Sequence, residues 1–108
     1  MKLRMKALAG VVKSTTDLDQ MFGKQGFQRC HNQPPTYRAP LTDLCSGNVY
    51  RLSVPTKFSE VDEGLRLEEP ILELKGENYP SASEHIPSEV LTAAHEKIEE
   101  LASYLRHS

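Results

Sequence analysis

The sequence predicts an α+β fold: an antiparallel sheet of four to five strands with two helices packed on one face. Three observations lead to this prediction. Short alternating segments bounded by glycine and proline are typical of strands. Two other segments place apolar residues at helical spacing. The resulting order, β-α-β-β-β-β-α, lacks the regular βαβ alternation of parallel sheets. With 108 residues, the chain is expected to form a single α+β domain over residues 1–108.

The N-terminal part contains one predicted strand and one short predicted helix. Residues 2–8 alternate between apolar and basic side chains, which predicts a half-buried strand. Ser14-Thr15-Thr16-Asp17 offers oxygen atoms that cap free N–H groups at a helix start. Leu18 and Phe22 follow on one apolar stripe, and Gly26 ends the helix because glycine accepts the left-handed conformation.

The middle of the chain reads as strands separated by turns. Residues 27–31 predict a strand that ends at the Pro-Pro pair 34–35, because proline has no backbone N–H to donate. Residues 36–41 and 49–54 predict a hairpin around a turn at 46–48. The polar and acidic stretch 55–64 predicts a loop.

The next apolar residues change register. Leu65 and Leu67 occupy odd positions, whereas Leu72 and Leu74 occupy even ones. A slip of one residue would turn one of these pairs toward solvent. The sequence therefore predicts a bulge or kink at Glu68-Glu69-Pro70 that keeps both pairs on one buried face.

The clearest structural signal is the last predicted helix. After a loop over residues 76–86, Pro87 suits the first turn of a helix, and Glu89 complements its dipole. Seven apolar residues then fall within an arc of about 120°: Val90, Leu91, Ala94, Ile98, Leu101, Ala102 and Leu105.

Composition and charge describe a water-soluble chain with two unlike halves. Hydrophobic residues make up 38% and charged residues 26%, and the mean hydropathy is −0.50, as is typical of globular proteins. Residues 1–57 hold nine Lys/Arg against three Asp/Glu, and residues 58–108 hold four against twelve. We interpret this asymmetry as two differently charged faces of one domain.

The same composition sets expectations about location. No apolar run approaches the about 18 residues of a membrane span. The apolar stretch Ala7–Val12 is shorter than the core of a signal peptide. Two cysteines, Cys30 and Cys45, are too few for a disulfide framework. We therefore expect a cytoplasmic protein without a membrane segment.

The sequence contains no recognisable catalytic or metal-binding motif. The pair Gly23 and Gly26 lacks the spacing of phosphate-binding loops. Cys30 and Cys45 lack the paired spacing of structural zinc sites, so we predict no metal and no cofactor. Both cysteines are expected to be buried and inert. His95 begins a partial match to a zinc-protease motif without the second histidine, and we expect it beside the sheet.

One surface is the candidate for binding. Arg29, Arg38 and Arg51 fall on neighbouring predicted strands and are expected on the uncovered face of the sheet. Tyrosine and arginine are favoured at protein interfaces. The complete candidate surface comprises Arg29, Tyr37, Arg38, Tyr50, Arg51, Tyr79 and His85.

Three hypotheses about function follow. The first is a non-enzymatic module, expected to be a homodimer, that binds another protein through the open sheet face or an edge strand. The second is a small-molecule enzyme or sensor with a pocket between sheet and helices that uses Arg38, Tyr79 or His85. The third, nucleic-acid binding through the basic half, ranks last because the acidic half opposes a polyanion.

The order of short motifs resembles the YugN-like family of small cytoplasmic proteins from spore-forming Firmicutes. These motifs are Ala9-Gly10, Gly26-Phe27, Thr36-Tyr37, Tyr50-Arg-Leu-Ser-Val-Pro55, Asn78-Tyr79-Pro80 and Ile86-Pro-Ser-Glu-Val90. The chain differs at His31–Pro35, where the family has an aromatic-rich stretch, and at Ser81–Ser83, where it has His-Gly. The resemblance implies an α+β fold with no established activity, and it supplies no catalytic residues.

Overall fold

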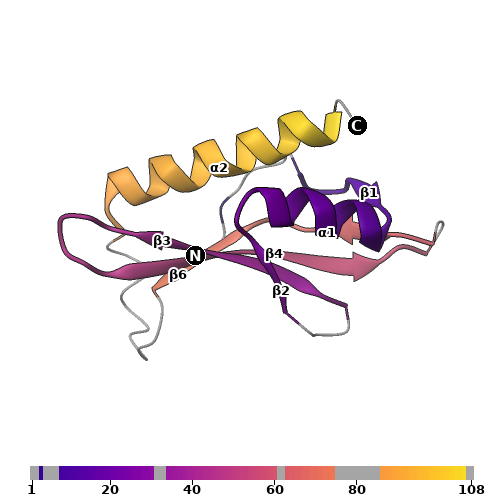
Figure 1. Cartoon of the computed structure of the whole chain (residues 1–108), viewed down its shortest axis with the longest axis horizontal. Helices are drawn as coiled ribbons and strands as arrows, with labels where there is room; N and C mark the ends of the chain where they lie inside the picture. Colours follow the sequence, from indigo (N-terminus) through magenta and orange to yellow (C-terminus); the bar gives the residue numbers. More distant parts are fainter. Residues whose placement is uncertain (1–2, 4–7, 31–33, 61–62, 75–85, 107–108) are drawn as a thin grey trace.

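The computed structural model describes Leu3 and residues 8–30, 34–60, 63–74 and 86–106. Its strands and helices confirm the α+β class, with both helices over one face of an antiparallel sheet (Figure 1). In chain order the elements are β1 (Val12–Lys13), α1 (Thr15–Lys24), β2 (Gln28–Cys30), β3 (Thr36–Thr42), β4 (Val49–Phe58), β5 (Leu65–Leu67), β6 (Ile71–Leu74) and α2 (Ser88–Arg106).

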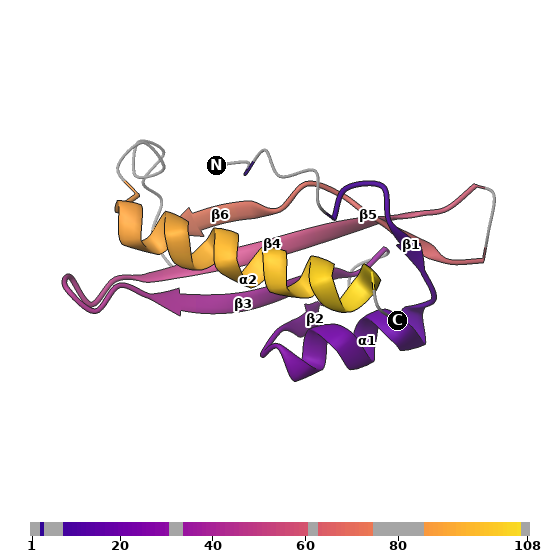
Figure 2. The same cartoon turned by 90° about the horizontal axis from the view of Figure 1, so that it is seen from above.

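The long strand β4 organises the sheet (Figure 2). It pairs with β3 along one edge, and its other edge is shared by β6 and then β5. Strand β2 lies outside β3, and β1 lies outside β5. The predicted hairpin is confirmed, with Tyr37 opposite Val54 and Ala39 opposite Leu52.

Strand β4 is longer than the sequence predicts, because it continues through Pro55 to Phe58. The expectation of a loop starting at Pro55 was therefore wrong. Pro55 can stay in the strand because it lies beside the bulge, where its carbonyl accepts the N–H of Glu68 at 2.9 Å. Pro40 is tolerated in β3 for a related reason, since β2 pairs no further along β3 than Arg38.

The bulge predicted at Glu68-Glu69-Pro70 is present. Ser53 faces Ile71 and Thr56 faces Leu67, so two residues of β4 lie opposite three residues between β5 and β6. The extra residue restores one buried face, since Leu67 and Leu72 are both fully buried. It also divides the last predicted strand into β5 and β6, so the described residues form six strands rather than the four to five expected.

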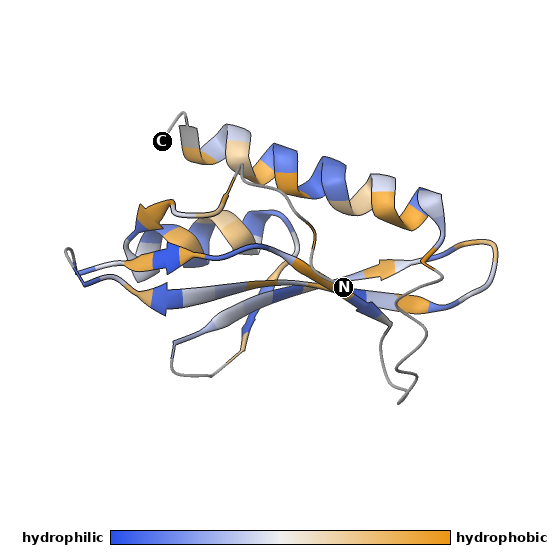
Figure 3. Cartoon of the chain, turned by 180° about the vertical axis from the view of Figure 1, so that it is seen from behind, coloured by the Kyte–Doolittle hydropathy of each residue, from blue (hydrophilic) through white to orange (hydrophobic). Residues whose placement is uncertain are grey.

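Both helices bury the apolar stripe that the sequence predicts. Ser14 caps α1, and its Oγ accepts the N–H of Asp17 at 3.2 Å. Along α2, apolar and polar residues alternate with the helical period (Figure 3). Six of the seven predicted α2 residues are buried, namely Val90, Ala94, Ile98, Leu101, Ala102 and Leu105. Neither helix of the described chain combines the length and apolarity that crossing a bilayer requires.

The start of the chain contains a strand that the sequence does not predict. The first described strand is β1 at Val12–Lys13, and the strand expected over residues 2–8 lies outside the described residues except for Leu3 and Leu8. Both leucines are buried, and the N–H of Leu3 donates to the carbonyl of Pro70 at 2.8 Å. Leu3 and Leu8 therefore add apolar side chains to the core, and Leu3 lies beside the bulge.

Removing the extra bulge residue should destabilise the fold. Deletion of Glu69 would shift Leu72 to the solvent face, so we expect a loss of unfolding free energy at least as large as that of Leu72→Ala, about 2–5 kcal/mol. Urea unfolding measures this loss. Glu69→Ala, which keeps the residue count, should stay close to the wild type, and a deletion as stable as Glu69→Ala would contradict this account of the bulge.

Candidate functional site

The face of the sheet opposite the helices is the candidate binding surface. Because side chains alternate along each strand, the residues paired across β3, β4 and β6 form rows on this face. One row holds Arg38, Ser53 and Ile71, and the next holds Pro40, Arg51 and Glu73. Both helices lie on the other side (Figure 1). We call these six residues the open face.

Two of the three predicted arginines share the open face, and the third does not. Arg38 and Arg51 lie there, each half-buried. Arg29 is opposite Tyr37, on the side covered by α1, and its Nη1 lies 2.9 Å from Oδ2 of Asp19. The expected row of three arginines is therefore wrong for Arg29, because the register of the short strand β2 turns it toward α1.

The tyrosines expected beside the arginines lie elsewhere. Tyr37 is 1% exposed and Tyr50 is 4% exposed, and both point toward the helices. The ring of Tyr37 stacks on Phe22 at a centroid distance of 4.3 Å. The expectation that these tyrosines line the open face was wrong, because their odd–even position matches the apolar face of the hairpin. Tyr79 and His85 lie outside the described residues.

The two arginines of the open face differ in their ion pairs with carboxylates. Arg51 Nη2 lies 3.1 Å from Oε2 of Glu73. The Nε atoms of Arg38 and Arg51 are buried and have no hydrogen-bond partner among the described residues. No described carboxylate forms an ion pair with Arg38. Among the described residues, the open face thus presents one guanidinium that pairs with a carboxylate and one that does not.

A hydrogen-bond network that the sequence does not reveal lies on the covered face. The hydroxyl of Tyr37 donates to Oδ1 of Asp19 at 2.6 Å. Burial, together with this bond to a carboxylate, raises the pKa of Tyr37 above its ordinary value of 10.0. The network joins β3 to α1 across 18 residues of sequence, so no local spacing indicates it.

Three possible metal ligands meet at the β3–β4 turn. One ligand atom from each of Asp43, Cys45 and Glu89 lies within 4.8 Å of the others. Asp43 is buried, but its carboxylate already accepts the Cys45 N–H at 3.1 Å and the Ser46 hydroxyl at 2.7 Å. Cys45 and Glu89 are exposed. The turn therefore accounts for Asp43 without an ion.

The exposure of Cys45 and of His95 differs from the prediction. Cys30 is half-buried and Cys45 is exposed, and both are free thiols. The expectation of two buried cysteines was wrong, because the turn at Cys45 projects from the sheet. His95 is exposed on α2 rather than beside the sheet.

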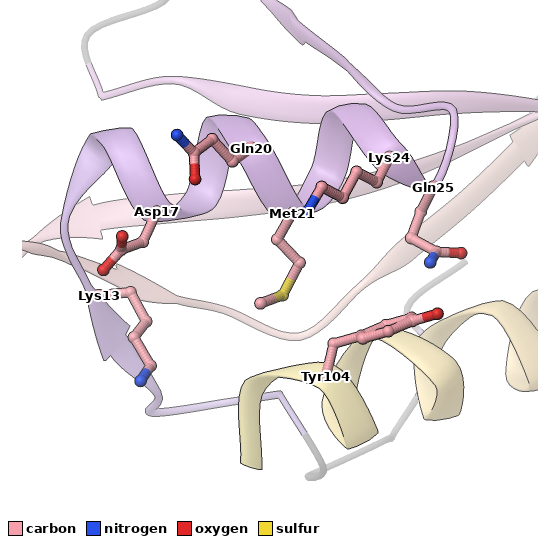
Figure 4. Close-up of a pocket in the computed structure, with 7 residues that line it drawn as sticks. All are labelled: Lys13, Asp17, Gln20, Met21, Lys24, Gln25 and Tyr104. Carbon is pink, nitrogen blue, oxygen red and sulfur yellow. The ribbon is translucent and has the colours of Figure 1, made fainter. Parts of the chain in front are cut away.

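A groove separates α1 from the C-terminal half of α2 (Figure 4). Its volume is about 600 Å³. Seven side chains line it, namely Lys13, Asp17, Gln20, Met21, Lys24, Gln25 and Tyr104. Arg38 lies on the opposite face of the sheet, so its expected place in a pocket between sheet and helices was wrong, while Tyr79 and His85 of the same hypothesis lie outside the described residues.

Comparison with known proteins supports the fold. No family model matches the chain, and no curated protein matches it. Its fold is that of a YugN-like α+β protein. The crystal structure of the uncharacterised conserved protein YugN from Geobacillus kaustophilus superposes with a TM-score of 0.77, at 21% sequence identity, over 99% of this chain and 96% of that one. The resemblance suggested by the motifs thus agrees with the fold.

The raised pKa of Tyr37 gives a prediction about pH. The native chain keeps this proton above pH 10.0, whereas the unfolded chain loses it, so the contribution of Tyr37 is fully present below pH 10.0 and falls as pH rises further. Tyr37→Phe should lower the free energy of unfolding by about 1.5 kcal/mol near neutral pH, because Asp19 loses a charge-assisted hydrogen bond. The loss stays at this size because Asp19 is partly exposed and water can replace the bond.

Denaturant unfolding of wild type and Tyr37→Phe at neutral pH and above pH 10.0 tests this expectation. The difference between the two proteins should shrink at the higher pH. Tyr104→Phe is the matched control, because Tyr104 is 53% exposed. A difference that grows with pH would contradict the assignment of the hydrogen bond.

Proposed function

We propose that this chain is a non-enzymatic protein-binding module whose open face binds an acidic segment of a partner protein. The observation that carries the proposal is Arg38, a half-buried arginine in the middle of a sheet face that neither helix covers. The Nε of Arg38 is buried and has no hydrogen-bond partner among the described residues, and a guanidinium gains by pairing with a carboxylate. Arginine is also enriched in the centres of protein interfaces.

The charges around Arg38 favour an acidic protein segment over a nucleic acid. Glu73 lies on the open face, and Glu68 lies beside the bulge within 3.5 Å of the Lys57 ammonium. These carboxylates pair with Arg51 and Lys57, so few unpaired cations remain among the described residues on this side for a continuous phosphate backbone. Tyr37 and Tyr50, which could stack on bases, are buried on the other face. A short peptide can place one carboxylate at Arg38 and avoid Glu73.

The predicted homodimer uses a different element. Two copies pressed together by their open faces would bring arginines of like charge near one another, which is unfavourable. Strand β2 offers a better contact, because among the described strands it pairs only with β3 and its outer edge is free. We therefore propose that a second copy adds to β2 and leaves the open face accessible.

Labelled acidic peptides test the proposal. Fluorescence anisotropy should show that Glu-rich or Asp-rich peptides bind. Arg38→Gln should weaken this binding about tenfold, because one charge-assisted hydrogen bond is lost. Lys97→Gln, the same charge change on α2, should bind as the wild type does. Light scattering of the same samples reports the number of copies.

Three results would count against the proposal. The first is that no acidic peptide binds, and the second is that Arg38→Gln binds as tightly as Lys97→Gln. The third is that a single-stranded DNA oligomer binds more tightly than the peptides, with the steep salt dependence of phosphate contacts.

A further inference from the structure

The groove between α1 and α2 is unrelated to the open face. It lies on the helix side of the molecule, and its volume of about 600 Å³ is within the range of about 300–1,000 Å³ found for small-molecule sites. Its lining residues come from β1, α1, the residue after α1, and α2. A groove of this size between two packed helices can hold a molecule of one or two rings.

The walls of the groove suit a flat ring. Tyr104 projects from α2, and the residue is 53% exposed although aromatic side chains usually bury far more of their surface. Met21, which is half-buried, points from α1 toward Tyr104 (Figure 4). A thioether on one side and an aromatic face on the other are favourable surroundings for a planar apolar group.

The charged residues of the groove suit one negative charge. Lys13 and Asp17 lie at one end, and Lys24 and Gln25 lie at the other (Figure 4). Asp17 opposes the charge of Lys13 at the first end, whereas no carboxylate lines the second end among the described residues. An anionic group is therefore best placed beside Lys24, with the Gln25 amide as an additional donor.

We propose that this groove binds a small planar molecule that carries one carboxylate, that is, an aromatic carboxylate. The ring lies between Met21 and Tyr104, and the carboxylate accepts from the Lys24 ammonium. Glu100, one turn before Tyr104 on α2, is exposed but does not line the groove. The site is independent of Arg38 and of the proposed peptide binding.

Titration of the protein with three probes tests the site, and the chemical shifts of the backbone amides report binding. The probes are naphthoate, its neutral amide, and cyclohexanecarboxylate, which keeps the charge but lacks a flat ring. We expect naphthoate to shift amides of α1 and α2 in a saturable way. It should bind at least about tenfold more tightly than its amide, since one charge-assisted bond contributes that much. It should also bind more tightly than cyclohexanecarboxylate, which lacks the flat ring that Tyr104 and Met21 contact.

Variants separate the contributions of ring and charge. Lys24→Gln should weaken naphthoate binding about tenfold and remove the preference for naphthoate over its amide. Tyr104→Leu should weaken binding, whereas Tyr104→Phe, which keeps the ring, should retain it. Lys57→Gln on β4 is the matched control, because Lys57 does not line the groove.

The proposal would be overturned by the absence of saturable shifts, by equal affinity for naphthoate and its amide, or by unchanged binding in Lys24→Gln. Shifts confined to β3, β4 and β6 would place the ligand on the open face instead. Peptide binding by Arg38→Gln and naphthoate binding by Lys24→Gln are separate measurements. Failure of the proposed peptide binding therefore does not contradict the proposed groove site, and the reverse also holds.

Discussion

Leu52 and Val54, in the middle of β4, are fully buried, while the residues between and beside them turn toward the opposite face. This alternation along one strand is the constraint on which the remaining structure depends. β3 must match it in register, and β5 and β6 must match it from the other edge. The helices can then bury their apolar stripes only on the side where Leu52 and Val54 point. One face of the sheet is covered as a consequence, and the other is left to the polar residues of the same strands.

The bulge and the aromatic stack make this arrangement possible. Without the extra residue at Glu68-Glu69-Pro70, Leu67 and Leu72 could not both meet the apolar side of β4. On the other edge, Phe22 stacks on Tyr37, and the Tyr37 hydroxyl donates a hydrogen bond to Asp19. These contacts fix α1 over β3. The groove between α1 and α2 is thus a consequence of where Phe22 and Tyr37 hold α1.

Local periodicity predicts most of the fold but little of the candidate sites. The helical stripe from Val90 to Leu105, the hairpin and the bulge all follow from the spacing of apolar residues, which depends only on neighbours in sequence. The loop predicted from Pro55 was wrong because the sequence cannot show that the bulge of the neighbouring strands lies beside this proline. Arg29 was misplaced for a similar reason, because its face depends on the register of β2, which has three residues, and on Asp19, which is distant in sequence. Tyr37 was misplaced although its odd position, shared with Ala39, matches the apolar face of the hairpin. The groove is formed by segments that meet only in the folded chain.

Thiol labelling tests most directly whether the helices cover one face and leave the other open. Leu72 and Glu73 are adjacent on β6, and they point to opposite faces, with exposures of 0% and 47%. Each is replaced by cysteine in a chain whose Cys30 and Cys45 are changed to serine. The account predicts rapid modification of the native Glu73→Cys protein and modification of Leu72→Cys only on unfolding. Equal protection of both positions would show that something covers the open face, and it would contradict the central claim.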